Sequence, residues 1–247
     1  MDRGRGEQFR ATLRERVLIF DGAMGTSIHA CGLSLDDYEG HEGCSEILVV
    51  TRPEVIRDIH ASFLAVGCDA IETNSFGANR IVLGEYGIAE RAYELNHRAA
   101  ALAREVAADF STPEHPRFVV GSLGPGTRLP TLGHTDFDTL RAMYHEQAAG
   151  LIAGGADVLL IETCQDLLQA KAALLGVLDA RHEAGCDLPV MLQVTIESNG
   201  TMLLGTEIGA ALTTFLGYPL DAFGLNCATG PARMAEHIRY LAQNSPL

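Results

Sequence analysis

The sequence predicts a single α/β domain built on a parallel sheet, and three observations lead to this prediction. Short, continuously apolar runs recur along the 247 residues, as expected for parallel strands that are covered on both faces. Amphipathic stretches separate these runs, and each run is followed by polar or small residues. No Ser/Pro-rich linker or charge block divides the chain, so one domain is favoured over two.

Six runs rich in Val, Ile, Leu and Phe are the predicted strands, and a helix is predicted after each. The strands span 17–20, 70–71, 118–120, 158–161, 190–194 and 222–225. Apolar residues at helical spacing mark the helices, in chain order: Val55, Ile56, Ile59 and Phe63 after Pro53; Leu95, Ala99, Leu102 and Val106; Leu140, Tyr144 and Leu151; Leu167, Leu174 and Leu178; Ile208, Leu212 and Phe215; Met234, Ile238 and Leu241.

The residues that follow the strands decide between two architectures. An open doubly wound sheet gathers its polar residues at one switch point, whereas a barrel brings the carboxyl end of every strand to one rim. All six predicted strands are followed by such residues: Asp21-Gly22, Glu72-Thr73-Asn74, Gly121-Ser122, Glu162-Thr163, Thr195-Ile196-Glu197 and Asn226-Cys227. This favours a (β/α)8 TIM barrel. Because that barrel has eight βα units, residues 1–247 are predicted to form one barrel domain, incomplete at its C-terminus by about two units.

Composition and charge exclude two classes of partner. The net charge of −14 is opposite in sign to the basic surface that nucleic acids require. No apolar run approaches the roughly 18 residues of a membrane span, and the first residues are too polar for a secretory signal. The six cysteines include no CxxC pair, which is typical of reduced thiols. We therefore expect a cytoplasmic protein with neither nucleic-acid nor membrane partners.

The strand-end motifs form a recognisable set. They are Asp21-Gly22-Ala23-Met24-Gly25-Thr26, Glu72-Thr73-Asn74-Ser75-Phe76-Gly77, Gly121-Ser122-Leu123-Gly124-Pro125, Glu162-Thr163 and Gly224-Leu225-Asn226-Cys227. Together they resemble the homocysteine S-methyltransferase family. More narrowly, stretches 124–134 and 226–231 are similar to the homocysteine-binding module that opens cobalamin-dependent methionine synthases. The resemblance covers nearly the whole chain in the right order.

The resemblance implies a barrel enzyme that binds homocysteine and ligates its sulfur to zinc through three cysteines. Cys227 matches the first of these ligands, whereas the family's Gly-Gly-Cys-Cys pair after the eighth strand has no counterpart before Leu247. The methyl donor implied is methylcobalamin, regenerated from methyltetrahydrofolate, with both bound by other modules of a longer polypeptide. Methyl transfer to homocysteine would form methionine.

The chemistry of thiols agrees with this outline. A free thiol is mostly protonated at neutral pH, because its pKa is about 8.5, and it must become a thiolate to attack a methyl group. A zinc ion held by thiolates offers a fourth position where a substrate sulfur binds deprotonated. A lone cysteine is more often a buried structural residue, but Cys227 lies at a strand end beside Asn226, where barrels place active residues.

The same rim offers groups for the amino-acid end of a substrate. Asp21 and Glu162 follow predicted strands, and the resemblance assigns them to amino-acid recognition, in which a pair of carboxylates holds an ammonium; singly, each is more often a turn or solvated rim residue. The backbone at Gly22 and Ala23 is expected to receive the substrate carboxylate, compatibly with a tight turn. Further candidates for substrate contact are Thr73, Asn74, Ser75 and Asn226, whose alternative role is loop capping.

Other functions remain open on the sequence alone. The rivals are a homocysteine methyltransferase that uses S-methylmethionine and a non-catalytic barrel fragment with exposed sheet edges. An aldolase is disfavoured because the only lysine, Lys171, lies in a predicted helix. Residues 121–126 lack the Gly-Lys-Ser/Thr ending of a phosphate loop, which argues against nucleotide binding.

Overall fold

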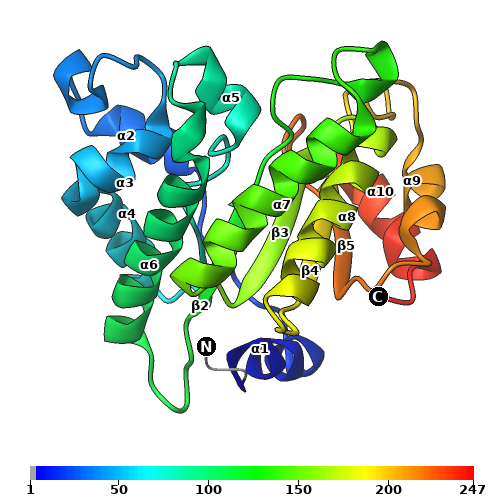
Figure 1. Ribbon diagram of the computed structural model, residues 1–247. Helices are drawn as coiled ribbons and strands as arrows, with labels where there is room; N and C mark the ends of the chain where they lie inside the picture. The colour runs from blue at the N-terminus through cyan, green and yellow to red at the C-terminus, as the bar shows by residue number, and fades with distance from the viewer. Residues whose placement is uncertain (1–3) are drawn as a thin grey trace.

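The computed structural model describes residues 4–247, and its centre is a sheet of five parallel strands (Figure 1). Residues 1–3, which begin the polar N-terminal stretch, lie outside the described residues. The strands lie side by side in chain order and are β1 (Ala70–Glu72), β2 (Phe118–Leu123), β3 (Val158–Cys164), β4 (Val190–Val194) and β5 (Ala222–Leu225). The predicted α/β class and parallel sheet are confirmed, with the sheet open rather than closed into a barrel.

The first predicted strand, 17–20, differs from the prediction. It forms only a parallel bridge between Phe20 and Ala70, so the sheet contains five strands and a bridge instead of six strands. Val17 and Ile19 are 78% and 58% exposed, because among the described residues this segment has a neighbour on one side alone. All four residues of β5, at the opposite edge, are only half-buried. An unpaired edge therefore lies at each end of the sheet.

The six predicted helices are all present. They are α4 (Pro53–Ala65), α6 (Ala92–Phe110), α7 (Phe137–Gly154), α8 (Leu167–Glu183), α9 (Ile208–Phe215) and α10 (Pro231–Asn244). Helices α6, α7 and α8 lie in a row against the outer face of the sheet (Figure 1). Glycine permits this close packing, since a Cβ at Gly154 of α7 would clash with the carbonyl oxygen of His97 in α6. The structure adds short segments that the sequence did not predict: α2 (Met24–Ala30), α3 (Leu48–Thr51), α5 (Arg80–Glu85) and four 3-10 turns at Leu35–Tyr38, Ser45–Ile47, Ala89–Arg91 and Pro130–Leu132.

An unpredicted N-terminal helix, α1 (Gly4–Glu15), crosses the amino-terminal end of the sheet (Figure 1). Phe9 is fully buried there and packs edge-on against Phe118 at 5.2 Å. Three arginines from α1 and the residue after it each pair with an aspartate that immediately precedes β1, β3 or β5: Arg16 with Asp69 at 2.6 Å, Arg5 with Asp157 at 2.9 Å, and Arg10 with Asp221 at 2.6 Å. The ion pairs of this segment thus connect the first, middle and last strands of the open sheet.

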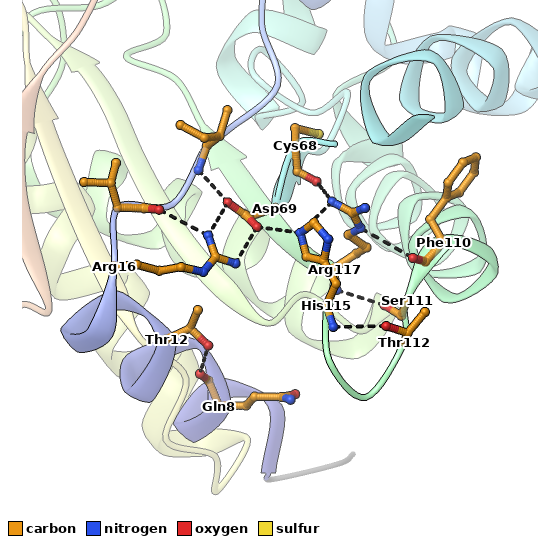
Figure 2. A network of polar contacts seen from close by, with 12 residues as sticks. Gln8, Thr12, Arg16, Cys68, Asp69, Phe110, Ser111, Thr112, His115 and Arg117 are labelled. Carbon is orange, nitrogen blue, oxygen red and sulfur yellow. Dashed lines mark hydrogen bonds and ion pairs between the residues drawn. The ribbon is translucent and has the colours of Figure 1, made fainter. Parts of the chain in front are cut away.

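Figure 2 shows one of these pairs in its surroundings. Asp69 accepts hydrogen bonds from two nitrogens of Arg16, from the backbone N–H of Ile19 at 2.8 Å, and from His115 at 2.8 Å. Arg117 in turn donates to the Cys68 carbonyl. Charge-assisted bonds of this kind hold the pKa of Asp69 well below its usual value, and they fix the 17–20 segment beside β1. Among residues 4–247 no helix is long and apolar enough to cross a membrane.

Candidate functional site

The predicted rim residues meet in a cavity of about 590 Å³ at the carboxyl ends of the strands. Every position along the sheet contributes to its lining: Asp21 after the bridge, Glu72 from β1, Ser122 from β2, Glu162 from β3, Gln193 from β4, and Asn226 with Cys227 after β5. A larger groove of about 730 Å³ lies outside the sheet between α4 and α6 and contains no strand-end residue. The parallel sheet therefore brings the polar strand-end residues together in the smaller cavity.

Of the residues predicted to contact a substrate, all but one line this cavity. Those that do are Asp21, Gly22, Ala23, Thr73, Asn74, Glu162, Asn226 and Cys227. Ser75 is fully buried beneath it, where its Oγ donates to the carbonyl of Ser122 at 2.8 Å and shares a 2.6 Å hydrogen bond with Thr73. Ser75 therefore supports the floor of the cavity.

Four carboxylates line the cavity, and three of them, Asp21, Glu72 and Glu162, lie along the rim of the sheet. Asp21 has a side chain only 4% exposed, and burial, with a contribution from Glu162, raises its pKa to about 7. Burial raises the pKa of Glu72 well above its ordinary value, and the charges of Glu162 and Asp21 add to this shift. The pKa of Glu162 is also raised by burial. A cavity with this concentration of buried carboxylates favours a cationic ligand such as a primary ammonium.

Asn226, which follows β5, forms hydrogen bonds with two residues of β3 at the cavity. Its Nδ2 donates to Glu162 Oε2 and to Thr163 Oγ1, each at 2.9 Å, and its Oδ1 accepts from the backbone N–H of Thr163 at 3.0 Å. Glu162 Oε1 also accepts from Ser122 Oγ at 2.5 Å. This network fixes the orientation of the Glu162 carboxylate and the path of the chain into Cys227, whose Sγ lies 3.6 Å from Thr163 Oγ1.

The backbone around the cavity is strained. Five non-glycine residues have a positive φ among residues 4–247, and four of them lie at the rim of the cavity: Ala23, Thr163, Cys227 and Ala228. Their φ values of 27°, 60°, 58° and 52° lie in the left-handed region that side chains with a Cβ rarely adopt. Such strain persists where surrounding structure enforces it and concentrates at functional sites. Cys227 is accordingly presented as an exposed thiol at a sharp turn.

Sequence reasoning missed several lining residues. Glu46 reaches the cavity from a 3-10 turn and accepts from the backbone N–H of Gly77 at 2.8 Å. No pattern pointed to it, because it belongs to a segment far from any strand end. Gln193 carries a detectable signal, because it is a polar residue within an otherwise apolar strand and in a barrel such a residue can face the interior. Ser122 is among the predicted strand-end residues, but it was not predicted to contact a substrate.

The described residues do not complete the zinc site that the family resemblance implies. Among residues 4–247 no group of three or more His, Cys, Asp or Glu side chains is arranged to hold a metal ion. Cys227 is the single predicted ligand in this part of the chain, and Cys68 and Cys164, which lie next to β1 and at the end of β3, are buried. One thiolate does not make a structural or catalytic zinc site. A zinc site of the kind that the resemblance implies would need ligands in addition to Cys227.

Comparison with curated proteins gives long relatives. The chain is 53% identical over 233 residues to the methionine synthase of Mycobacterium tuberculosis (strain ATCC 25618 / H37Rv). It is 52% identical over 234 residues to the methionine synthase of Mycobacterium leprae (strain TN). The alignments cover 94% and 95% of this chain but only 20% and 19% of the relatives. The chain therefore spans about a fifth of the length of these relatives.

Comparison with solved structures identifies the fold, and a family model identifies the family. The metallated homocysteine methyltransferase MmuM from Escherichia coli superimposes with a TM-score of 0.78 at 22% identity, covering 95% of this chain and 82% of that one. Its apo form gives a TM-score of 0.73 at 23% identity, covering 95% and 81%. The open five-stranded sheet thus shares the fold of this methyltransferase and is consistent with a partial barrel. Because residues 18–247 match the family model described as homocysteine S-methyltransferase, the chain belongs to the homocysteine S-methyltransferase family, as its strand-end motifs predicted.

Proposed function

We propose that this chain is the homocysteine-binding barrel domain, residues 1–247, of a longer methionine synthase that methylates the thiol of homocysteine to form methionine. The observation that carries the proposal is the shared cavity of Asp21, Glu162 and Cys227, which come from opposite edges and the middle of the sheet. The high identity to methionine synthases over nearly the whole chain supports the same assignment.

The cavity suggests how homocysteine is oriented. Its ammonium lies between Asp21 and Glu162, which offer charge-assisted hydrogen bonds from two sides. Its carboxylate lies near the backbone of Gly22 and Ala23, at the turn that opens the cavity. Its sulfur is directed toward Cys227. The remaining contacts come from Thr73 and Asn74 along the floor, with Asn226 holding Glu162 in place.

The reaction requires a thiolate, a methyl donor and their alignment. The homocysteine sulfur loses its proton and attacks the methyl carbon, and the donor keeps the electron pair of the broken bond. We propose methylcobalamin as the donor and methyltetrahydrofolate as its source, both bound by other modules of the parent polypeptide. In that polypeptide Cys227 is proposed as one of three thiolate ligands of zinc, which would favour the ionised substrate sulfur. The residues of this chain contribute the binding and orientation of homocysteine.

The state of the cysteines supports a cytoplasmic location for this reaction. All six cysteines are unpaired, as is typical of a reducing compartment. We accordingly place the protein in the cytoplasm, with homocysteine and the folate- and cobalamin-binding modules as its partners.

A calorimetric titration of the chain with homocysteine tests the proposal. Homocysteine is expected to bind the wild-type chain, and Asp21→Asn is expected to weaken binding by about tenfold or more, because a neutral amide replaces a charge-assisted acceptor. Asp58→Asn is the matched control, since Asp58 is an exposed carboxylate on the outer face of α4. No detectable binding, or equal weakening by both variants, would reject the proposed site.

Donor assays on the parent polypeptide separate the remaining functions. Turnover with methylcobalamin but not with S-methylmethionine supports the methionine synthase assignment. Turnover with S-methylmethionine alone would replace it with the rival methyltransferase. Homocysteine binding without turnover in either assay would leave a substrate-binding module.

A further inference from the structure

One buried imidazole stands next to the cavity with no assigned role. His60 lies on α4 with a side chain that is 0% exposed. Among residues 4–247 neither of its ring nitrogens has a hydrogen-bond partner. The polar group facing it is the carboxylate of Asp21, whose Oδ2 lies 3.9 Å from His60 Nδ1.

An unpaired buried imidazole requires an explanation. Buried polar groups are nearly always hydrogen-bonded, because a donor or acceptor that is left unpaired in the interior costs free energy. The neighbouring positions of α4 that face the core, Ile56, Ile59 and Leu64, are apolar, so an aliphatic side chain at position 60 would pack there without this cost. Burial also lowers the pKa of His60 to about 4, which leaves the ring neutral at pH 7 with one N–H to donate.

Asp21 presents one carboxylate oxygen to this ring, and its carboxylate also receives hydrogen bonds from the backbone N–H groups of Glu72 and of Asp21 itself. Its Oδ1 accepts the backbone N–H of Glu72 at 3.0 Å, whereas its Oδ2 faces His60. The other titratable groups that act on Asp21 oppose its ionisation or respond to it: the carboxylates of Glu72 and Glu162 and the thiol of Cys68. A neutral donor on Oδ2 favours the ionised carboxylate. A permanent cation at this position would instead pair with Asp21 and compete with a substrate ammonium.

We propose that His60 is a positioning residue for amino-acid recognition, whose neutral Nδ1–H closes on Oδ2 of Asp21 and holds that carboxylate ionised and oriented toward the substrate ammonium. This inference rests on the proposed function, because it assigns His60 to the same homocysteine site. His60 does not touch the substrate itself. The contact requires the 3.9 Å separation of the two atoms to shorten by about 1 Å, to the length of an ordinary hydrogen bond.

Two variants of His60 separate this role from simple packing. His60→Leu fills the same space without a donor, whereas His60→Asn keeps a donor near the position of Nδ1. Exposed His29 supplies the control variant His29→Leu. The measurements are the titration of the Asp21 carboxyl by carbon-13 NMR in the ligand-free chain, homocysteine affinity between pH 6 and 8, and urea unfolding.

His60→Leu is expected to raise the pKa of Asp21 by about one unit; from a starting pKa of about 7, this lowers the ionised fraction, and with it the homocysteine affinity, by about fivefold at pH 7. In this variant the pH at which homocysteine affinity rises should also move to a higher value. Its free energy of unfolding in urea should be unchanged or greater. His60→Asn is expected to restore both the titration and the affinity. A purely structural histidine would alter urea unfolding and leave the Asp21 titration in place.

Several results would overturn the inference. They are an Asp21 titration that is the same in wild type and His60→Leu, identical behaviour of the Leu and Asn variants, or nitrogen-15 NMR showing the proton of His60 on Nε2 in the wild-type chain. Because the Asp21 titration and the nitrogen-15 spectrum need no ligand, they test the His60 contact even if the wild-type chain binds no homocysteine. An absence of homocysteine binding to the wild-type chain would reject the proposed function, independently of the His60 contact.

Discussion

Replacing Glu162 with glutamine is the substitution that most directly tests how the cavity works. The wild-type carboxylate accepts one hydrogen bond on each oxygen, from Ser122 at 2.5 Å and from Asn226 at 2.9 Å. A carboxylate has about four lone-pair positions, so about two remain for a ligand. In Glu162→Gln the amide oxygen still accepts from Asn226 and the amide nitrogen donates to Ser122 Oγ, whose hydroxyl can rotate. The variant therefore keeps its internal contacts and loses the negative charge together with one acceptor oxygen.

The expected magnitude follows from that loss. A hydrogen bond to a charged group contributes about 1.5–3 kcal/mol, so the dissociation constant for homocysteine should rise about ten- to 150-fold. Stability should move the other way. Burial raises the pKa of Glu162 in the folded chain, so the ionised carboxylate destabilises the fold at pH values above its folded pKa, and this cost disappears below its ordinary pKa. Glutamine removes the cost at pH 7.

The assay combines calorimetric titration with homocysteine and urea unfolding at pH 7 and pH 4. Weaker binding together with equal or greater stability at pH 7 is the expected signature, and the stability difference should shrink at pH 4. Glu114→Gln, at an exposed position, is the matched control. Affinity within twofold of wild type would refute the ammonium role of Glu162. A loss of stability at pH 7 would instead show that its charge holds Ser122 and Asn226 in place.

Three further predictions concern the fold that supports the cavity. Arg10→Ala should destabilise the chain by about 1–3 kcal/mol, because Asp221 loses its charged partner at the edge of the sheet; urea unfolding measures this, and no change would refute the tie. Asp69 has a lowered pKa, so its contribution to stability is present above its ordinary pKa and declines as pH falls through the folded value; Asp69→Asn should lower stability at pH 7 and flatten the decline in acid unfolding curves, and a parallel curve would contradict the assignment. Gly154→Ala should cost about 1–3 kcal/mol through the clash with His97, visible as a lower melting temperature, whereas Gly217→Ala, which meets no neighbour, should be tolerated.

The sequence alone determined the order of the five strands and of the six helices that follow predicted strands, and most of the residues that meet at the rim. Continuous apolar runs located β1 to β5 because strands covered on both faces must be apolar throughout. The polar residues that follow the predicted strands, such as Asp21, Glu162 and Cys227, could be expected in one cavity because parallel strands in a barrel end at the same rim. These inferences need only local patterns and one topological rule.

Only the tertiary structure decided what depends on neighbours that are distant in sequence. Residues 17–20 have the composition of a strand, yet they pair with β1 only through the bridge between Phe20 and Ala70. Ser75 shares a motif with Asn74 but turns beneath the cavity, where Ser122 offers it a carbonyl. His60 reads as one more position on an amphipathic helix until the fold sets it beside Asp21. Such outcomes are fixed by packing and hydrogen bonding between residues that are distant in sequence, and a local sequence pattern carries no information about these contacts.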